Sequence, residues 1–407
     1  MYLDYAAATP VDKRVLTAML PYFSDDFYNP SAAYAPARAV RAVYEDARHK
    51  IAQTIGAKPA EIVMTAGATE SINLAFNCIC HSAQSRRIQK DDGMGPATAC
   101  RMTATTITTA IEHPAILECA KAKNAVILPV DETGRVSLDE LKKNITNDTR
   151  FISVGYANNE IGTVQPIKEV AELVKQVRQD RLARNNQTPL LLHTDASQAA
   201  GYLDINVARL GVDLMTLNAG KCYGPKQVGL LYVRAGAELK PLIRGGGQEM
   251  GLRSGTENVA GAVGFAVALE IAEKKRKSEV KRLGELRQGL EKYIATHITT
   301  YYKKIGTVPN GSGKHRLPNI LNFSIPGLDG ERLVYALDQR GICVATGSAC
   351  AANKGTRSHV LTAIGLDDIT ADGSIRVSMG RQTTAEQIEE FEKVLQDVVI
   401  AESKLVS

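Results

Sequence analysis

Cys350 lies in a stretch of small and polar residues, which reads ATGSACAANKG at positions 345–355. A structural cysteine usually has apolar neighbours, whereas small and polar neighbours favour an exposed thiol on a movable loop. The thiolate of such a cysteine is a nucleophile, and it can collect a chemical group and pass it on. The sequence therefore predicts a reactive thiol on a mobile loop, at about residues 345–356.

Two further residues whose side chains could take part in a reaction follow apolar runs. Asp195 ends the run LLLHTD, and Lys221 lies in TLNAGKCYGP, directly after another run. Each alone has a plainer interpretation, since an aspartate at a strand end often caps the next helix and a lysine usually lies in solvent. Together they favour a pyridoxal phosphate site, in which a lysine amine holds the cofactor and a carboxylate keeps the pyridine nitrogen protonated.

The segment TAGATESINLAF, residues 65–76, could bind the phosphate of that cofactor. It is typical of a strand end, a turn of small residues and a helix that begins near Thr69. Backbone N–H groups at a helix N-terminus attract anions. An ordinary capped helix would have the same pattern, so this segment gains weight only beside Asp195 and Lys221.

Two more polar residues could complete a site. His113 follows an apolar run in TAIEHPAI, and it could stack on a flat cofactor ring and move protons, although a lone histidine is more often structural. Arg376 lies in GSIRVSMGR, where polar and apolar residues alternate as in a strand. It could bind a substrate carboxylate through two parallel hydrogen bonds, or it could simply be solvated.

Short apolar runs separated by helical patterns indicate the elements that position these residues. This alternation is typical of an α/β fold with a mostly parallel sheet of seven strands flanked by helices. Ligands of such sheets bind beyond the carboxyl ends of the strands. The helical stretches include residues 167–184, and the strands are expected at 61–67, 104–111, 125–130, 151–157, 189–195, 214–219 and 228–234.

After about residue 258 the sequence pattern changes and predicts a smaller α+β domain. Its expected elements are a long helical pattern at 258–297 that is broken once, a strand at 319–325 and helices at 330–341 and 384–403. We expect a large domain over 15–260 and a small domain from 1–14 and 261–407. Two polar stretches, 81–102 and 306–316, are expected to be surface loops.

Composition excludes several classes of protein. The 407 residues carry a formal charge of +5 that is spread along the chain, without the basic block and interleaved aromatics of a direct nucleic-acid binder. No apolar run approaches the length of about 18 residues that a membrane span needs, and the start lacks a secretory leader, so we expect a cytoplasmic protein. Seven cysteines at irregular spacing argue against a disulfide framework, and no metal site is expected.

Taken together, these motifs resemble the cysteine desulfurases of the NifS/IscS type, within the class V aminotransferase-like pyridoxal phosphate enzymes of fold-type I. The resemblance covers nearly the whole chain, and its strength lies in the order of the motifs. They are YLDYAAATPVDKRVL, NPSAAYAPAR, MTAGATESINLA, IEHPAI, ANNEIGTVQPI, HTDASQAAG, GKCYGPKQVGLLYVR, GGGQEMGLRSGTEN, LPNILNFS, GSAC and SIRVSMGR.

The resemblance implies how pyridoxal phosphate would be held. Lys221 would form a Schiff base with it, and Asp195 would pair with its ring nitrogen. His113 would stack on the ring, with Gln198 and Asn159 on the side of the ring hydroxyl.

The resemblance also implies a phosphate site. Ala68, Thr69 and Asn218 would hold the phosphate, joined by Thr256 from the neighbouring subunit of a homodimer.

For the reaction, the resemblance implies L-cysteine as substrate. Arg376 and Asn159 would bind it, and His113 would help in the acid–base steps. Cys350 would attack the substrate sulfur, so that alanine leaves and a persulfide remains. That sulfur would pass to an acceptor protein, such as an iron–sulfur scaffold or a tRNA thiolation enzyme, and Cys350 could also ligate a transferred iron–sulfur cluster.

One motif departs from the family pattern. Members usually have Ser-Gly-His-Lys or Ser-Ala-His-Lys around the lysine, whereas this chain has Asn218, Ala219 and Gly220 before Lys221. Loss of one hydrogen bond to a charged phosphate weakens binding by about ten- to a hundredfold unless another group compensates. Two alternatives therefore stay open: a non-catalytic paralogue that acts as an interaction scaffold, or another class V enzyme such as a selenocysteine lyase.

Overall fold

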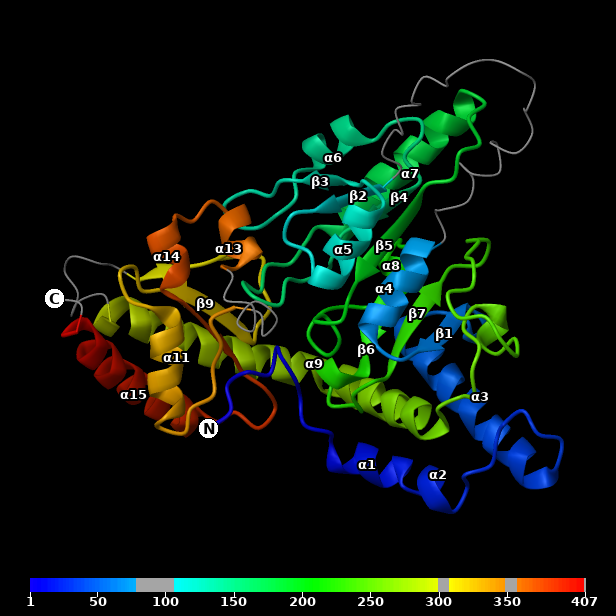
Figure 1. The fold of residues 1–407 in the computed structure, drawn as a ribbon, viewed down its shortest axis with the longest axis horizontal. Coiled ribbons are helices and arrows are strands. Elements are labelled where there is room, and N and C mark those ends of the chain that lie inside the picture. The colour runs from blue at the N-terminus through cyan, green and yellow to red at the C-terminus, as the bar shows by residue number, and fades with distance from the viewer. Residues whose placement is uncertain (78–105, 299–306, 348–356, 406–407) are drawn as a thin grey trace, which may run out of the picture.

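The computed structural model describes residues 1–77, 106–298, 307–347 and 357–405 (Figure 1). Among these residues, seven strands form one large sheet in the order β1-β7-β6-β5-β4-β2-β3. The neighbours from β6 through β5, β4 and β2 to β3 run parallel, and β7 is antiparallel to both β1 and β6. The mostly parallel sheet predicted from the sequence is thus confirmed. Its strands are β1 (Ile62–Thr65), β2 (Thr106–Thr109), β3 (Val126–Leu128), β4 (Phe151–Ser153), β5 (Leu191–Asp195), β6 (Leu214–Asn218) and β7 (Gly229–Val233).

Helices cover both faces of this sheet, which explains why its strands are apolar runs rather than alternating patterns. Successive strand residues point to opposite faces, so Met64 joins one core cluster and Val63 joins another. On the Met64 face lie α3 (Ala35–Ile55), α7 (Ile167–Ala183), α8 (Val207–Leu210) and the first part of α9 (Val259–Tyr293). On the Val63 face lie α4 (Ala68–Asn77) and α5 (Pro114–Ala122).

A second, smaller sheet has its own core. Its order is β10-β9-β8, with antiparallel pairing throughout. The core between this sheet and its helices contains Leu3, Phe323 and Phe391. The elements are β8 (Val308–Pro309), β9 (Ile320–Ser324), β10 (Ser374–Ser378), α11 (Gly330–Asp338) and α15 (Ala385–Ser403). The remaining helices are α1 (Lys13–Met19), α2 (Pro21–Ser24), α6 (Leu138–Asn144), α13 (His359–Ala363) and α14 (Asp368–Asp372), with short 3-10 turns η1 (Pro59–Glu61), η2 (Ala219–Lys221) and η3 (Glu249–Gly251).

Helix α9 joins the two cores. Phe265 in its first half packs under the large sheet, and Leu290 in its second half packs under the small one (Figure 1). The predicted break was wrong, because the helix runs unbroken to Tyr293 and continues as a π-helical turn, η4 (Ile294–Ile298). Glycine serves close packing here, since a Cβ at Gly264 would come within 2.5 Å of the Met19 sulfur.

The expected loops differ in outcome. Residues 306–316 contain the short strand β8, so the prediction of a plain loop there was wrong. The expected loop at 81–102 lies outside the described residues. The division into domains of 15–260 and of 1–14 with 261–407 stays a prediction, although Leu3 does pack in the smaller core.

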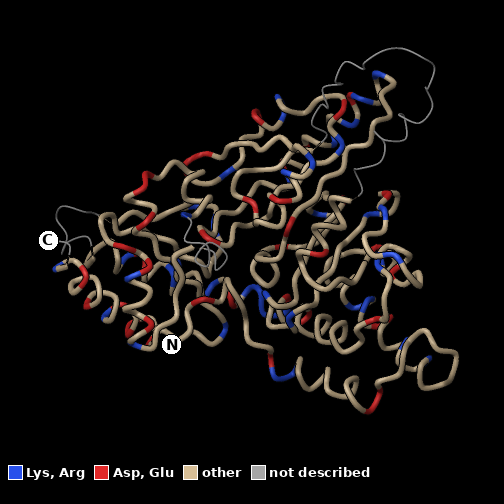
Figure 2. The backbone as a smooth tube through the Cα atoms, viewed as in Figure 1, with Lys and Arg blue, Asp and Glu red and all other residues tan. Residues whose placement is uncertain are grey.

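None of the helices in the described ranges is both long and apolar enough to cross a lipid bilayer. Basic and acidic residues are interspersed over the backbone of both parts of the fold (Figure 2).

Candidate active site

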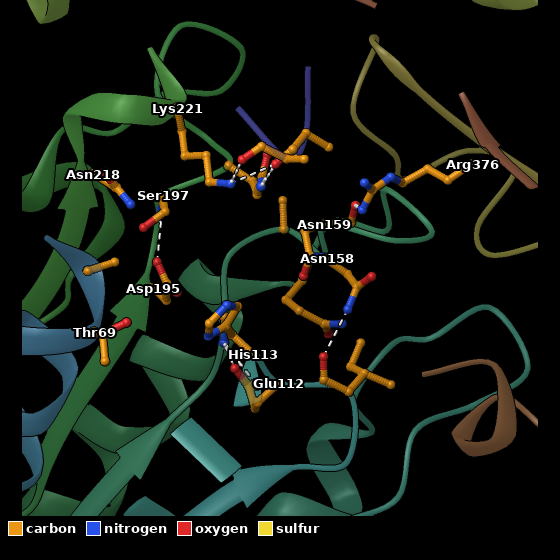
Figure 3. A pocket seen from close by; sticks show the side chains of 18 residues that line it. Thr69, Glu112, His113, Asn158, Asn159, Asp195, Ser197, Asn218, Lys221 and Arg376 are labelled. Carbon is orange, nitrogen blue, oxygen red and sulfur yellow. Dashed lines mark hydrogen bonds between the residues drawn. The ribbon is translucent and has the colours of Figure 1, made fainter. Parts of the chain in front are cut away.

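A cavity of about 250 Å³ opens beyond the carboxyl ends of β2, β4, β5 and β6. The parallel strands end at the same edge of the sheet, so residues that follow them in the sequence meet there (Figure 3). Nine of the residues singled out from the sequence line this cavity: Ala68, Thr69, His113, Asn159, Asp195, Gln198, Asn218, Lys221 and Arg376.

Lys221 ends η2, the turn that directly follows β6. Its Nζ donates to the backbone carbonyls of Ala6 and Ala7, at 2.8 and 2.6 Å. The amine thus lies inside the cavity and is held by the N-terminal segment. Sequence reasoning missed these carbonyls, because they come from residues far from Lys221 along the chain.

Asp195 is the last residue of β5, and its carboxylate lies at the cavity wall. Its Oδ1 accepts a hydrogen bond from the Ser197 backbone N–H at 2.9 Å, which fixes the carboxylate at the strand end. Gln198, in the same turn, donates from Nε2 to the Ala6 carbonyl at 3.0 Å.

His113 is the N-cap of α5, and its Nδ1 accepts from the Ala115 backbone N–H at 3.1 Å. The neutral ring therefore carries its proton on Nε2. His113 lines the cavity and is exposed there. Desolvation by the neighbouring protein lowers the pKa of His113, with a partly opposing effect from the Asp195 carboxylate.

Glu112, beside His113, is a buried acid that sequence reasoning missed. Its carboxyl accepts from the Thr109 hydroxyl at 2.6 Å and from the Gly155 backbone N–H at 3.0 Å. Burial raises the pKa of Glu112 to about 7, although the bonds from Thr109 and Gly155 act in the opposite direction. A single glutamate after a strand carries no sequence signal that separates it from a surface residue.

The N-terminus of α4 lies at the cavity, at the position where the sequence predicts a phosphate site. Ala68 and Thr69 begin this helix and line the cavity. The preceding Gly67 has φ +122°, a conformation that favours glycine. At Gly229 on β7, a Cβ would come within 2.7 Å of the Gly67 backbone, so two glycines allow this close approach.

Asn218 ends β6 at the cavity wall. Its Oδ1 accepts from the Gly220 N–H at 3.1 Å, which leaves its Nδ2 as a donor. A Cβ at Gly220 would meet Asn218 Oδ1 at 3.5 Å and Lys226 Cγ at 3.7 Å, which are ordinary contact distances.

Arg376 reaches the cavity from β10 in the smaller sheet, and only 1% of it is exposed. One guanidinium nitrogen donates to the Asn159 carbonyl at 3.0 Å, and the other donates to Asp4 Oδ1 at 2.5 Å. Its buried Nε has no hydrogen-bond partner among the described residues. Arg376 nevertheless lines the cavity, so its guanidinium is the positive group that an anionic ligand would meet there.

Thr256 and Cys350 are the two remaining predicted site residues. Thr256 is exposed and lies outside the lining, so its assignment to a neighbouring subunit's site stays a prediction. Cys350 lies outside the described residues. The lining also includes Asn158 and Ser197, which sequence reasoning did not single out.

The donor set fits pyridoxal phosphate. The N–H groups in the first turn of α4 have no carbonyl partner within the helix and can bind a phosphate, with Asn218 beside them. Lys221 supplies the amine and Asp195 the carboxylate that this cofactor requires. The guanidinium of Arg376 suits a carboxylate at the other end of the cavity.

Comparison with known proteins places this arrangement in context. Residues 1–391 match the family model described as aminotransferase class V. A curated cysteine desulfurase IscS from Dictyoglomus turgidum is 40% identical over 406 residues, which cover 98% of this chain and 94% of that protein.

Two solved structures are similar over most of their length. One is described as a NifS-like protein, with 34% identity, a TM-score of 0.84 and coverage of 98% of this chain and 99% of that one. The other is SspA in complex with cysteine, with 34% identity, a TM-score of 0.72 and coverage of 93% and 98%.

Proposed function

The chain belongs to the class V aminotransferase family, in its cysteine desulfurase branch, and we propose that it removes sulfur from L-cysteine with pyridoxal phosphate as cofactor. The products are L-alanine and a persulfide on Cys350, which makes the protein a sulfurtransferase. The observation that carries the proposal is the meeting of Lys221, Asp195 and Arg376 at one cavity.

Each residue of the cavity has a task in this proposal. Pyridoxal phosphate, when bound, supplies an electron sink for the substrate's α-carbon. Lys221 holds the cofactor through its amine, Asp195 provides the negative charge opposite the pyridine nitrogen, and the N-terminus of α4 binds the phosphate.

The substrate is oriented from the other end of the cavity. Arg376 pairs with the carboxylate of L-cysteine, and Asn159, whose carbonyl already holds the guanidinium, lies beside it. His113 lines the cavity and can carry a proton there, and desolvation lowers its pKa, which favours the neutral ring.

Cys350 completes the reaction in this proposal. Its thiolate attacks the substrate sulfur, so that an S–S bond forms while the Cβ–S bond of the substrate breaks. The electron pair of that bond stays with the carbon, which takes up a proton and leaves as alanine. No external oxidant is required, because the extra sulfur remains on Cys350 until an acceptor protein, either an iron–sulfur scaffold or a tRNA thiolation enzyme, receives it.

The proposal includes a homodimer in the cytoplasm. Large apolar side chains are exposed along α1, α2 and the segment after them: Leu16, Leu20, Phe23, Phe27 and Tyr34. A second copy would cover such a surface and could bring Thr256 to the neighbouring cavity. A reducing compartment would keep the thiols in their reactive form.

The visible absorption spectrum of the purified protein tests the proposal, recorded before and after L-cysteine is added. We expect a yellow band that changes with L-cysteine and is absent in Lys221→Ala. A Cys350→Ala variant should keep the band and its response but lose sulfur release. A protein that stays colourless with added pyridoxal phosphate would instead favour the scaffold alternative raised by Gly220.

A further inference from the structure

The N-terminal residues 3–9 form a strap that crosses the cavity between the two sheets. At one end, the Tyr5 N–H donates to the Ser378 carbonyl at 3.2 Å, which ties the strap to β10. At the other end, the Thr9 hydroxyl donates to the Gly220 carbonyl at 3.1 Å, next to Lys221. The strap backbone is therefore held on both sides of the cavity.

Within the strap, Asp4 directs its carboxylate to Arg376, with 2.5 Å between Oδ1 and the guanidinium nitrogen. The Asp4 backbone is fixed as well, since its carbonyl accepts from the Tyr2 hydroxyl at 2.9 Å and from the Ala7 N–H at 3.0 Å. These backbone bonds hold the Asp4 carboxylate beside Arg376. A guanidinium that is 1% exposed needs such a partner, because a buried unpaired charge is costly.

The pair with Asp4 leaves Arg376 able to bind another carboxylate. The bonds to Asn159 and Asp4 use two of the five N–H groups that a guanidinium carries, and Arg376 lines the cavity. A substrate carboxylate would therefore meet a guanidinium that is already fixed in place and partly neutralised.

We propose that Asp4 is a positioning residue that sets how tightly the site holds the carboxylate of its amino-acid ligand. This inference rests on the proposed function, in which Arg376 receives that carboxylate. The negative charge of Asp4 repels the incoming carboxylate and lowers the affinity of the site for the amino acid. L-Alanine carries the same carboxylate as L-cysteine, so a site without Asp4 would retain its product.

Asp4→Asn tests this inference, because it removes the charge and keeps an oxygen that can accept from Arg376. Calorimetry on the protein as purified would measure binding of L-alanine and of L-alaninamide, which lacks the carboxylate. We expect L-alanine to bind at least about tenfold more tightly, because a like charge within about 6 Å, at an effective dielectric of about 20, repels by more than a tenfold change requires. L-Alaninamide should bind unchanged, and KM for L-cysteine should fall more than kcat changes.

Matched variants separate this role from a purely structural one. Asp26→Asn removes an exposed charge from the same N-terminal region and should change neither affinity. In an Arg376→Ala background, no guanidinium holds the ligand carboxylate beside Asp4, so the effect of Asp4→Asn should be smaller than in wild type. If Asp4→Asn does not fold, Asp4→Ser removes the same charge and should give the same tightening.

Unchanged or weaker binding of L-alanine by the neutral variant would overturn the inference, and so would an equal change for L-alaninamide. A wild-type protein that binds neither ligand, or both equally, would also overturn it. Failure of the proposed function is distinguishable, because a protein that makes no L-alanine from L-cysteine could still show the predicted difference in binding.

Discussion

Replacing Glu112 by glutamine should make the stability of the protein less dependent on pH. Burial raises the pKa of this carboxyl from 4.5 to about 7, so the folded protein holds the proton more tightly than the unfolded chain does. The group therefore contributes stability below pH 4.5, and this contribution is lost as pH rises through about 7. The difference corresponds to about 3 kcal/mol over that interval.

Glu112→Gln keeps the size of the side chain and an oxygen that can accept from Gly155, but it has no proton to lose. Urea unfolding at about pH 5 and about pH 8 would give the change in unfolding free energy for each protein. We expect the loss between these pH values to be about 2–3 kcal/mol smaller in the variant than in wild type. Glu132→Gln, at an exposed position, is the control and should behave as wild type.

The same loss of stability in wild type and Glu112→Gln would refute this reasoning. It would mean that the carboxyl stays ionised inside the protein, held by the bonds from Thr109 and Gly155.

Three further predictions follow from the geometry. Gly229→Ala forces a Cβ to within 2.7 Å of the Gly67 backbone, which precedes α4. Pyridoxal phosphate should therefore bind more weakly when the cofactor-free protein is titrated with it. Unchanged affinity would contradict the proposal that the N-terminus of α4 binds the phosphate. Glu249→Ala leaves the buried Arg48 without its partner at 2.5 Å and should cost about 3–5 kcal/mol in urea unfolding, whereas Glu45→Ala, an exposed partner of the same arginine, should cost about 1 kcal/mol or less. Because desolvation lowers the pKa of His113, the acidic limb of the plot of kcat against pH should have its midpoint below the ordinary histidine value of about 6.5. A midpoint above about 6.5 would argue against neutral His113 as the proton carrier.

Most of the site could be predicted from the sequence because strand ends in a parallel sheet converge. Asp195, Lys221 and His113 each follow an apolar run, and the sheet brings these ends to one cavity. Arg376 could be assigned to a strand from its alternating neighbours, and it does lie in β10. Its approach to the cavity, however, depends on how the smaller sheet packs, which local pattern does not encode.

The parts that escaped prediction depend on contacts between distant residues. Ala6 and Ala7 reach the cavity, and Asp4 reaches Arg376, because the N-terminal strap pairs with β10, and no periodicity in YLDYAAATP indicates this. Likewise, the glycines early in α9 are as consistent with a helix break as with close packing against Met19, and only the tertiary contact decides.

The most direct test of the central claim is the formation of L-alanine from L-cysteine by the purified protein with pyridoxal phosphate. The account predicts continuous formation of L-alanine in the presence of a thiol that removes sulfur from Cys350, and no L-alanine from the Lys221→Ala variant. A wild-type protein that binds the cofactor but forms no L-alanine would contradict the claim that this cavity is the active site of a cysteine desulfurase.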